Sequence, residues 1–366
     1  MPPNAVAARL SADEFGVLLP GLSPDAAAHF GRDVLSALAK PVRIDGLELA
    51  VGGSVGVAGV RPDDEPGSVL RRADVALFQA KERRGSVAIY DPERDEFSRH
   101  RLRLAAELRD GIASGQLELW YQPQIAAGTW EVCGVEALVR WRHPSDGLLA
   151  PGSFLPTARR AGLMAALSEV VVRQVIADAR RWQDRGCSFV VAVNIAPPEL
   201  LSGPVLARLF HDAASAGLPP NSIVVEVTED SFMAEPDRAR AMIDDIRRHD
   251  HQVAIDDYGT GFSSLAYLCE LPVNEVKIDR SFVAQLLTDH RTHMIVATTN
   301  AMAHGLGLRT VAEGVEDAET AEALVRLGFD VLQGFHFAAP MPAQELTAWV
   351  TRWTAEHVER SGIMRS

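Results

Sequence analysis

The feature that most restricts the fold of this chain is an alternation of short apolar segments and helical stretches from Leu117 onward. Eight segments have the length and the β-branched composition that are typical of strands: 117–125, 132–141, 189–195, 223–228, 253–257, 275–279, 310–313 and 331–337. Helical patterns separate most of them, at 168–185, 236–249, 292–304 and 318–327, whereas only a short turn near Gly128 separates the first two. Eight strands with helical crossovers predict an α/β fold of the TIM-type (β/α)8 barrel class. An open doubly wound sheet is the alternative, which the strand count makes less favoured.

Polar side chains stand at the ends of nearly all these strands. In β/α barrels the functional groups lie at the C-terminal ends of the strands. Here those ends carry Glu136, Arg140, Asn194, Glu226, Asp256, Asp257, Lys277, Glu313 and Gln333. Any one of them is as typical of a structural ion pair or a helix cap as of a functional site. Five carboxylates at one barrel mouth need another explanation, because each buried charge costs several kcal/mol without a counter-ion and Lys277 alone cannot neutralise them.

The stretch VAIDDYGTGFSSLAYL, residues 253–268, places two of these acids side by side. Successive side chains on a strand point to opposite faces, so Asp256 and Asp257 can converge only where the strand gives way to a loop. Gly259 and Gly261 supply the backbone freedom for such a loop. A surface Asx turn is the alternative for this stretch taken alone. The acids at the ends of the other strands favour a functional site over a surface turn.

The side chains at these strand ends that could ligate a metal ion are carboxylates and an amide, all of them oxygen donors. Neither cysteine nor histidine is among them. Oxygen ligands favour hard cations such as Mg²⁺ or Mn²⁺ over zinc. Six donors, two of them adjacent, suit a pair of cations about 4 Å apart, which can clamp phosphoryl oxygens and convert bound water into hydroxide. Composition and spacing therefore predict a metal-dependent phosphoester hydrolase.

Composition limits the other classes of function. The net charge of −13 makes a nucleic-acid polymer a poor partner but leaves a small phosphate ligand open, since bound cations reverse the local sign. Cys133, Cys187 and Cys269 are widely spaced and odd in number, which favours the reducing cytoplasm. The sequence contains no apolar run of about 18 residues and its start does not resemble a signal peptide, so we expect no membrane segment.

The first 90 residues read as a smaller α/β unit. We expect a hairpin over 9–20, a helix over 25–39 capped by Ser23, a strand-like stretch over 47–60 and a helix over 69–83. Residues 91–116 follow as a helical connector, in which Leu104, Leu108 and Ile112 form one apolar stripe. The expected organisation is thus a unit at 1–90, a connector at 91–116, a barrel at 117–354 and a C-terminal tail at 355–366.

A series of motifs in the barrel carries a family resemblance. In chain order they are YQPQ (121–124), EALVRW (136–141), VNIAPPEL (193–200), VEVTED (225–230), DDYGTGFSSLAYL (256–268), VKIDRSFV (276–283), VAEGVE (311–316) and LQGFHFAAPM (332–341). Through them residues 107–350 resemble the EAL-domain cyclic-di-GMP phosphodiesterases. The resemblance implies a modified TIM-type barrel whose first strand runs antiparallel to the others, and a bacterial, cytoplasmic signalling enzyme.

The resemblance also implies roles for individual residues. One cation would be held by Glu136, Asn194, Glu226 and Asp256, and the second by Asp256, Asp257 and Glu313. Lys277 would orient the attacking water, and Glu313 is often given the role of base. Substrate contacts would come from Gln122, Arg140 and Gln333, and supporting roles from Glu229 and Glu316. The implied reaction converts cyclic di-GMP to linear pGpG with Mg²⁺ or Mn²⁺.

Residues 1–90 resemble the second half of a GGDEF (diguanylate cyclase) domain. The matching segments are SADEF (11–15), GSVGVA (53–58) and LRRADVALFQAK (70–81). Ser11 and Ala12 replace the two signature glycines, and the first half of the domain, with its metal-binding acid, is missing. The resemblance therefore implies a partial, degenerate domain without cyclase activity.

Two further expectations concern the barrel as a whole. The alternative to an active enzyme is a catalytically silent cyclic-di-GMP receptor that acts through protein contacts, but the chain keeps every ligand, the lysine, Gly259 and Gly261. Family members often pair through the segment after Asp257, so the resemblance also implies a homodimer through the EAL domain.

Overall fold

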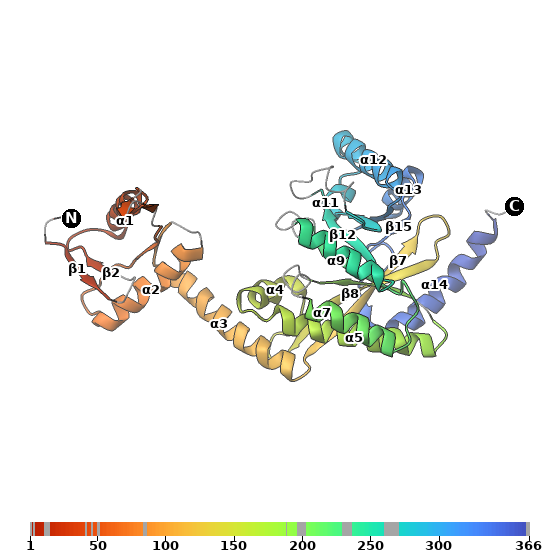
Figure 1. Cartoon of the computed structure of the whole chain (residues 1–366), viewed down its shortest axis with the longest axis horizontal. Coiled ribbons are helices and arrows are strands. Elements are labelled where there is room, and N and C mark those ends of the chain that lie inside the picture. The colour runs from red at the N-terminus through yellow and green to blue at the C-terminus, as the bar shows by residue number, and fades with distance from the viewer. Residues whose placement is uncertain are drawn as a thin grey trace. The chain divides into compact units, whose positions relative to one another are not determined.

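The structure is a computed structural model of the 366-residue chain, and it divides into two compact units, Met1–Leu104 and Ala105–Ser366. It describes residues 2, 4–10, 15–40, 42–44, 47–49, 52–82, 86–187, 189–195, 203–228, 236–259 and 271–363. Figure 1 shows the course of the chain through both units. No helix in the described ranges is long and apolar enough to cross a membrane.

The first unit is a small α/β assembly. Its strands pair as β1 (Val6–Arg9) with β2 (Phe15–Leu18), β3 (Val42–Ile44) with β4 (Leu47–Leu49), and β5 (Val55–Val57) with β6 (Val87–Ile89). Helices α1 (Pro24–Leu38) and α2 (Pro66–Glu82) both pack against β5 and β6. Ser23 caps α1 as expected, since its hydroxyl accepts from the backbone N–H of Ala26 at 3.3 Å. The stretch expected as one strand over 47–60 instead forms two separate strands, and α2 begins three residues before the predicted helix.

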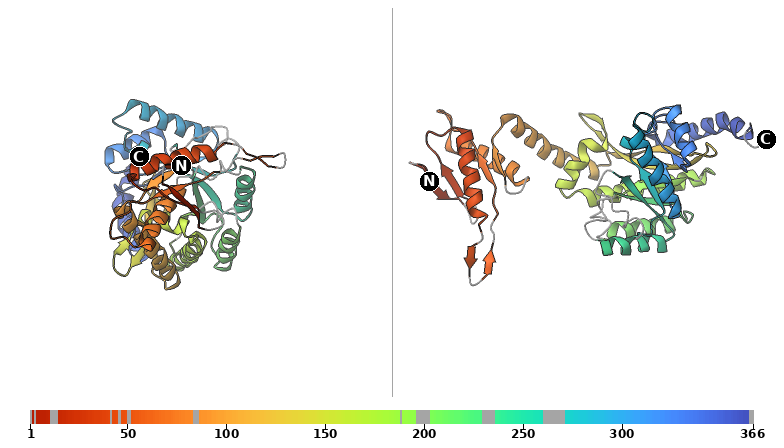
Figure 2. Two further views of the ribbon diagram at one scale, coloured as in Figure 1. Left: turned by 90° about the vertical axis from the view of Figure 1, so that its left-hand side faces the viewer. Right: turned by 90° about the horizontal axis from the view of Figure 1, so that it is seen from above.

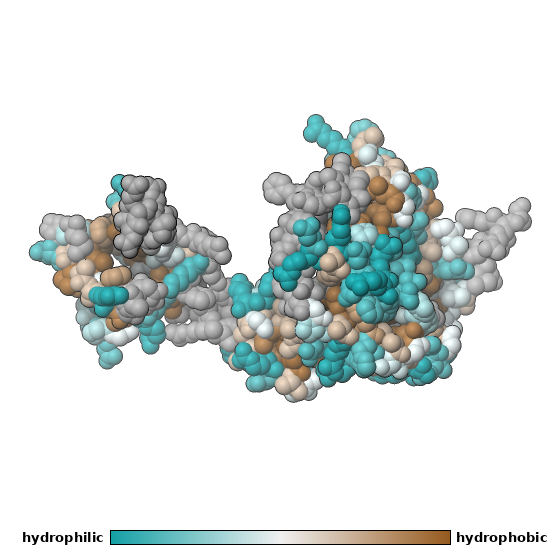
Figure 3. All heavy atoms as spheres, in the orientation of Figure 1, coloured by the Kyte–Doolittle hydropathy of each residue, from teal (hydrophilic) through white to brown (hydrophobic). Residues whose placement is uncertain are grey.

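The β1–β2 hairpin carries apolar side chains at its surface. Val6, Phe15 and Leu18 are all exposed, and Figure 3 shows hydrophobic residues gathered in this part of the unit. The turn with Ser11 and Ala12, which replace the signature glycines, lies outside the described residues.

Helix α3 (Pro92–Ala113) occupies the predicted connector. Leu104 and Leu108 of the expected apolar stripe are buried, and Ile112 is half-buried. Gly111 packs closely on the barrel, because a Cβ atom there would lie 2.7 Å from Nε1 of Trp141.

The second unit is the predicted barrel, closed by eight of the described strands. They are β7 (Leu117–Ala126), β8 (Val132–His143), β10 (Val190–Asn194), β11 (Ile223–Thr228), β12 (Gln252–Tyr258), β13 (Glu275–Ile278), β14 (Arg309–Ala312) and β15 (Val331–Leu332). Neighbours along this series are parallel from β8 to β15, whereas β7 runs antiparallel to both β8 and β15 and closes the circle. The expected inverted first strand is therefore present. The last strand is shorter than predicted, since it ends at Leu332 rather than at 337.

Helices surround the barrel, as Figures 1 and 2 show. The predicted ones are α5 (Met164–Asp184), α9 (Pro236–Arg248), α12 (His290–Gly305) and α13 (Ala318–Leu327). Sequence patterning missed α4 (Pro151–Arg160), α7 (Pro204–Ser215), the short α11 (Arg280–Val283) and α14 (Ala343–Ile363), and also the short strands β9 (Gly147–Leu149) and β16 (Met341–Pro342). Helix α14 continues through the expected domain end at 354 as far as Ile363.

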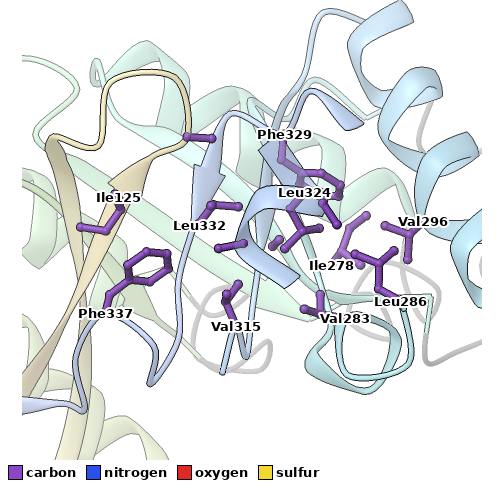
Figure 4. Packing of buried hydrophobic residues seen from close by; sticks show 14 residues of the cluster. Ile125, Ile278, Val283, Leu286, Val296, Val315, Leu324, Phe329, Leu332 and Phe337 are labelled. Carbon is purple, nitrogen blue, oxygen red and sulfur yellow. The ribbon is translucent and has the colours of Figure 1, made fainter. Parts of the chain in front are cut away.

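One hydrophobic cluster among the described residues lies between the last strands of the barrel and the helices outside them. Figure 4 shows Ile278, Leu324 and Leu332 packed there with Phe329 and Phe337. Inside the barrel, Ala192, Val224 and Ala254 form a smaller buried cluster. These three residues precede Asn194, Glu226 and Asp256 by two positions each, so they fill the lumen beneath the polar strand ends.

Candidate active site

Strand register places the predicted polar residues on the inner face of the barrel, near its mouth. Asn194 is level with Glu226, Ala192 with Glu136, and Glu136 with Gln122 across the β7–β8 pair. Because alternate residues share a face, these side chains all point into the lumen at similar heights. The sequence-predicted groups from separate strands therefore meet in space.

Lys277 lies at the centre of this group. Its side chain is fully buried, and its Nζ lies 2.6 Å from Oε1 of Glu313, 2.7 Å from Oε1 of Glu226 and 3.0 Å from Oδ1 of Asp256. Oε2 of Glu136 is 3.7 Å away. One ammonium thus contacts carboxylates from four strands or strand ends.

The amide side chains of Asn194 and Gln333 donate hydrogen bonds to carboxylates of the site. The Nδ2 group of Asn194 donates to Oε1 of Glu136 and to Oε2 of Glu226, both at 2.8 Å. The Nε2 group of Gln333 donates to Oε2 of Glu136 at 2.5 Å and to Oε1 of Gln122 at 3.1 Å. For Asn194 to ligate a cation its amide oxygen would have to face the site, which requires the amide group to turn over.

Asp256 and Asp257 converge through a distortion at the end of β12. The register with β13 shifts between Ile255 and Tyr258, and Asp257 has a positive φ of 54°. A bulge of this kind redirects a side chain that regular pleating would send to the other face. Oxygens of Asp256, Asp257 and Glu313 consequently lie within 4.8 Å of one another, as one cation site would require.

Burial and mutual repulsion change the proton affinities of these acids. Burial raises the pKa of Glu226 well above its usual value, Glu136 adds to the effect, and Lys277 opposes it. Burial also raises the pKa of Asp257 to about 6, helped by the charge of Asp256, and that of Glu313 to about 8. Burial alone would lower the pKa of Lys277, but the surrounding carboxylates raise it well above its usual value.

The charge of the cluster fits a pair of divalent cations. When all five carboxylates are ionised, the single ammonium leaves an excess of four negative charges, which two divalent cations would balance. In addition, Oε1 of Glu226 and Oδ1 of Asp256 are buried and, although close to the ammonium, accept no well-aligned hydrogen bond. Oxygen atoms in this state can ligate a hard cation. The residues present therefore fit the metal pair that the sequence predicted.

The remaining predicted residues lie in different places. Arg140 is half-buried further toward the mouth, and its guanidinium carbon is 5.8 Å from the ring centroid of Trp120. Glu316 is exposed on the segment after β14, and Glu229 lies outside the described residues. Sequence reasoning missed Gln124, whose Nε2 donates to Oε1 of Gln333 at 3.0 Å. Its position two residues beyond Gln122 on the same face of a strand was the available signal.

Fold and site together define a TIM-type barrel with a cluster of acidic side chains around a buried lysine at its mouth. Residues 105–340 match the model of the EAL domain, so the chain belongs to the EAL-domain family. Residues 1–86 match the model of the diguanylate cyclase GGDEF domain.

Similar proteins include two curated relatives and one solved structure that are named as phosphodiesterases. The chain is 34% identical to the bifunctional diguanylate cyclase/cyclic di-GMP phosphodiesterase MucR of Pseudomonas aeruginosa, over 94% of this chain and 50% of that protein. It is also 34% identical to the cyclic di-GMP phosphodiesterase PdeR of Escherichia coli, over 96% of this chain and 53% of that protein. The chain thus spans about half the length of these curated relatives. The solved PaMucR phosphodiesterase in complex with c-di-GMP matches with a TM-score of 0.64 and 38% identity, over 67% of this chain and 99% of that one.

Proposed function

We propose that the barrel hydrolyses one phosphodiester bond of cyclic di-GMP and releases linear pGpG. The observation that carries this proposal is the group of Asp256, Asp257 and Glu313 around the buried ammonium of Lys277 at the barrel mouth. The likeness to the PaMucR phosphodiesterase, which covers nearly all of that chain, supports the same substrate.

Two groups of side chains would hold the cations. Glu136, Asn194, Glu226 and Asp256 would form one site, and Asp256, Asp257 and Glu313 the other. When bound, Mg²⁺ or Mn²⁺ supplies charge neutralisation at the phosphoryl oxygens and lowers the pKa of a coordinated water. The clustering of the second set supports this division.

The chain's own residues position the reactants. The ammonium of Lys277 donates toward the attacking water and holds it in line with the scissile bond, while Glu313, 2.6 Å from that ammonium, accepts the proton. Gln122, Gln333 and Arg140 bind the dinucleotide on the inner face of the barrel, where the two glutamines already hydrogen-bond to each other. Burial excludes bulk water and strengthens these interactions.

Turnover with purified protein tests the proposal. We expect pGpG to accumulate with Mg²⁺ or Mn²⁺, and to be absent with excess chelator or with Ca²⁺, whose longer ligand distances suit the site poorly. Tight binding of cyclic di-GMP without any pGpG under all these conditions would instead identify a silent receptor.

We further propose that two copies of the chain pair through α12. Met294 and Ile295 are exposed on this helix, and Leu287 is exposed just before it. The side of the barrel that carries α12 also shows hydrophobic residues at its surface in Figure 3. The buried residues of the same helix are the apolar Val296 and Ala303 and the polar Thr292 and Asn300. The apolar side chains that remain exposed on α12 support a face covered by a symmetric partner.

Light scattering coupled to size-exclusion chromatography measures this association directly. We expect a dimer for the native chain and a monomer for the double substitution Met294→Lys and Ile295→Glu. Leu148→Lys, which alters an exposed apolar residue on β9, is the matched control and should remain dimeric. The segment immediately after Asp257 that family members use for pairing lies largely outside the described residues.

We also infer that the protein works in the cytoplasm. Cys133 and Cys187 are free thiols, which supports a reducing compartment because disulfides persist mainly in oxidising ones. Fractionation of cells that express the natural gene tests this, and recovery in a membrane or periplasmic fraction would contradict it.

A further inference from the structure

The inner face of β7 and β8 continues past the acidic site toward the mouth of the barrel. Cross-strand neighbours on this face are Gln122 with Glu136, then Trp120 with Leu138, then Glu118 with Arg140. Because β7 runs antiparallel to the other strands, its N-terminal end lies beside their C-terminal ends. Trp120 therefore stands one step above Gln122 on the path by which a ligand reaches the carboxylates.

The indole of Trp120 is held in place by charged neighbours. Its Nε1–H donates to Oε1 of Glu118 at 2.9 Å. Glu118 is fixed in turn by Arg142, whose Nη2 and Nε donate to its two oxygens at 2.7 and 3.1 Å. The guanidinium of Arg140 lies 5.8 Å from the indole centroid, within the range of a cation–π contact.

Partial exposure distinguishes Trp120 from the other large aromatic residues nearby. Tyr121 points to the opposite face of β7, where it is fully buried against Trp182, and Trp141 is also fully buried. Trp120 is only half-buried, although it faces the lumen of the barrel. A rigid indole that is left partly exposed above a phosphodiester site offers a flat apolar surface to a ligand.

We infer that Trp120, with Arg140 against it, is the stacking platform for one purine base of the dinucleotide and so a specificity-determining residue. This inference rests on the proposed function, because it places a base beside the phosphodiester that the acidic site would cleave. Trp120 acts on binding and not on the chemical step, since its polar partners are Glu118 and Arg140 rather than the carboxylates around Lys277. Glu118 is a positioning residue that holds the indole edge.

Stacking of a base on an aromatic side chain contributes about 1–3 kcal/mol, which corresponds to an affinity change of about 5- to 150-fold. Trp120→Ala should weaken cyclic di-GMP binding within this range. Trp120→Phe keeps an aromatic face but loses the N–H bond to Glu118, and should recover most of the affinity. An aliphatic residue of similar size, as in Trp120→Leu, should not recover it.

Equilibrium binding of cyclic di-GMP to the full chain, measured by calorimetry in chelator, tests the platform independently of turnover. Steady-state kinetics with Mg²⁺ then separate binding from chemistry. We expect Trp120→Ala to raise KM by the same factor while kcat changes less than about threefold, within the scatter of a nearby substitution. The kcat/KM for methyl p-nitrophenyl phosphate, which has no base, should fall much less than the kcat/KM for cyclic di-GMP. Trp349→Phe on α14 is the control for loss of an indole elsewhere.

The outcomes separate the inference from the proposed function. If the native chain binds and hydrolyses cyclic di-GMP but Trp120→Ala keeps the native dissociation constant and KM, the platform is wrong and the proposed function stands. If the native chain binds without hydrolysis, the proposed reaction fails and the binding series still decides the platform. If the native chain does not bind cyclic di-GMP, both fail.

Discussion

Lys277 is the residue on which the charge balance of the site depends, since its buried ammonium contacts four carboxylates. We expect Lys277→Met to lower the free energy of unfolding by about 3–5 kcal/mol in chelator, because the carboxylates lose their buried counter-ion. Urea unfolding at neutral pH measures this effect. Added Mg²⁺ should narrow the gap to the native chain. The exposed Lys40→Met is the control, and an unchanged midpoint for Lys277→Met in chelator would contradict the electrostatic account.

Asp256 belongs to both sets of predicted cation ligands, so its loss should affect chemistry far more than folding. We expect Asp256→Asn to reduce pGpG formation by at least about a thousandfold, the scale of removing a major electrostatic element from an active site. Its thermal stability without cations should be at least native, since one repelling charge is gone. Asp244→Asn alters an exposed acid on α9 and should leave the rate unchanged. A near-native rate for Asp256→Asn would show that the acid pair is only a turn.

At the level of single residues, the sequence located the acids, the lysine and most of the amides of the site, but not the hydrogen bonds between them. Glu136, Glu226 and Lys277 follow from a simple rule, because charged residues inside apolar strand segments are costly unless they share a site. The hydrogen bond between Gln124 and Gln333 joins side chains that are far apart in the sequence. The hydrogen bond between Trp120 and Glu118 joins side chains two residues apart on one strand. One sequence without structure does not specify those pairings.

Between elements, Asp330 connects three parts of the barrel wall. It precedes β15, and its Oδ2 accepts from the backbone N–H of Thr310 on β14 at 2.8 Å and contacts Nε2 of His304 on α12 at 2.9 Å. Burial alone would raise the pKa of Asp330, but the hydrogen bonds from Thr310 and His304 lower it overall. The carboxylate therefore stabilises the fold most when it is charged.

This lowered pKa gives a pH-dependent prediction. A depressed pKa in the folded state adds stability that is present above the ordinary aspartate value of 3.8 and is lost as the pH falls through the folded value. Asp330→Asn should cost about 1 kcal/mol at pH 7, a small figure because the side chain is partly exposed. The difference should shrink as the pH falls below 3.8. Urea unfolding of both proteins at neutral pH and at decreasing pH below that value, with Asp184→Asn on α5 as control, measures it. A difference that stays constant would contradict the account.

Elements were predictable in proportion to the regularity of their apolar pattern. Most of the barrel strands stood out because parallel strands that are buried on both faces read as nearly continuous apolar runs. The sequence pattern did not predict helices α4, α7 and α14, and α4 illustrates the reason. It spans only Pro151–Arg160 and contains Pro156 within the helix, a residue that usually signals a break. The sequence predicted that Asp256 and Asp257 converge where the strand gives way to a loop, whereas both lie within β12 and converge through a bulge with a positive φ at Asp257.

At the scale of the whole molecule, the N-terminal boundary of the barrel lies within helix α3. The C-terminal part of α3 packs on β8, the strand that carries Glu136 and Arg140. Leu108 is fully buried, and Glu107 lies 3.4 Å from Nε2 of His143. Gly111 allows the helix backbone to approach the indole of Trp141 too closely for any Cβ atom. This part of the helix therefore belongs to the core of the barrel rather than to a passive connector.

Two truncations test this boundary. The chain from residue 92, which keeps all of α3, should fold and hydrolyse cyclic di-GMP at nearly the full rate, because every predicted ligand lies beyond Leu117. The chain from residue 114 should lose about 3–5 kcal/mol of unfolding free energy, since Leu108 is removed and the indole of Trp141 becomes exposed. Urea unfolding and pGpG release measure both. Equal stability of the two would show that α3 is dispensable, whereas a folded but inactive chain from residue 92 would place the N-terminal unit in the catalytic machinery.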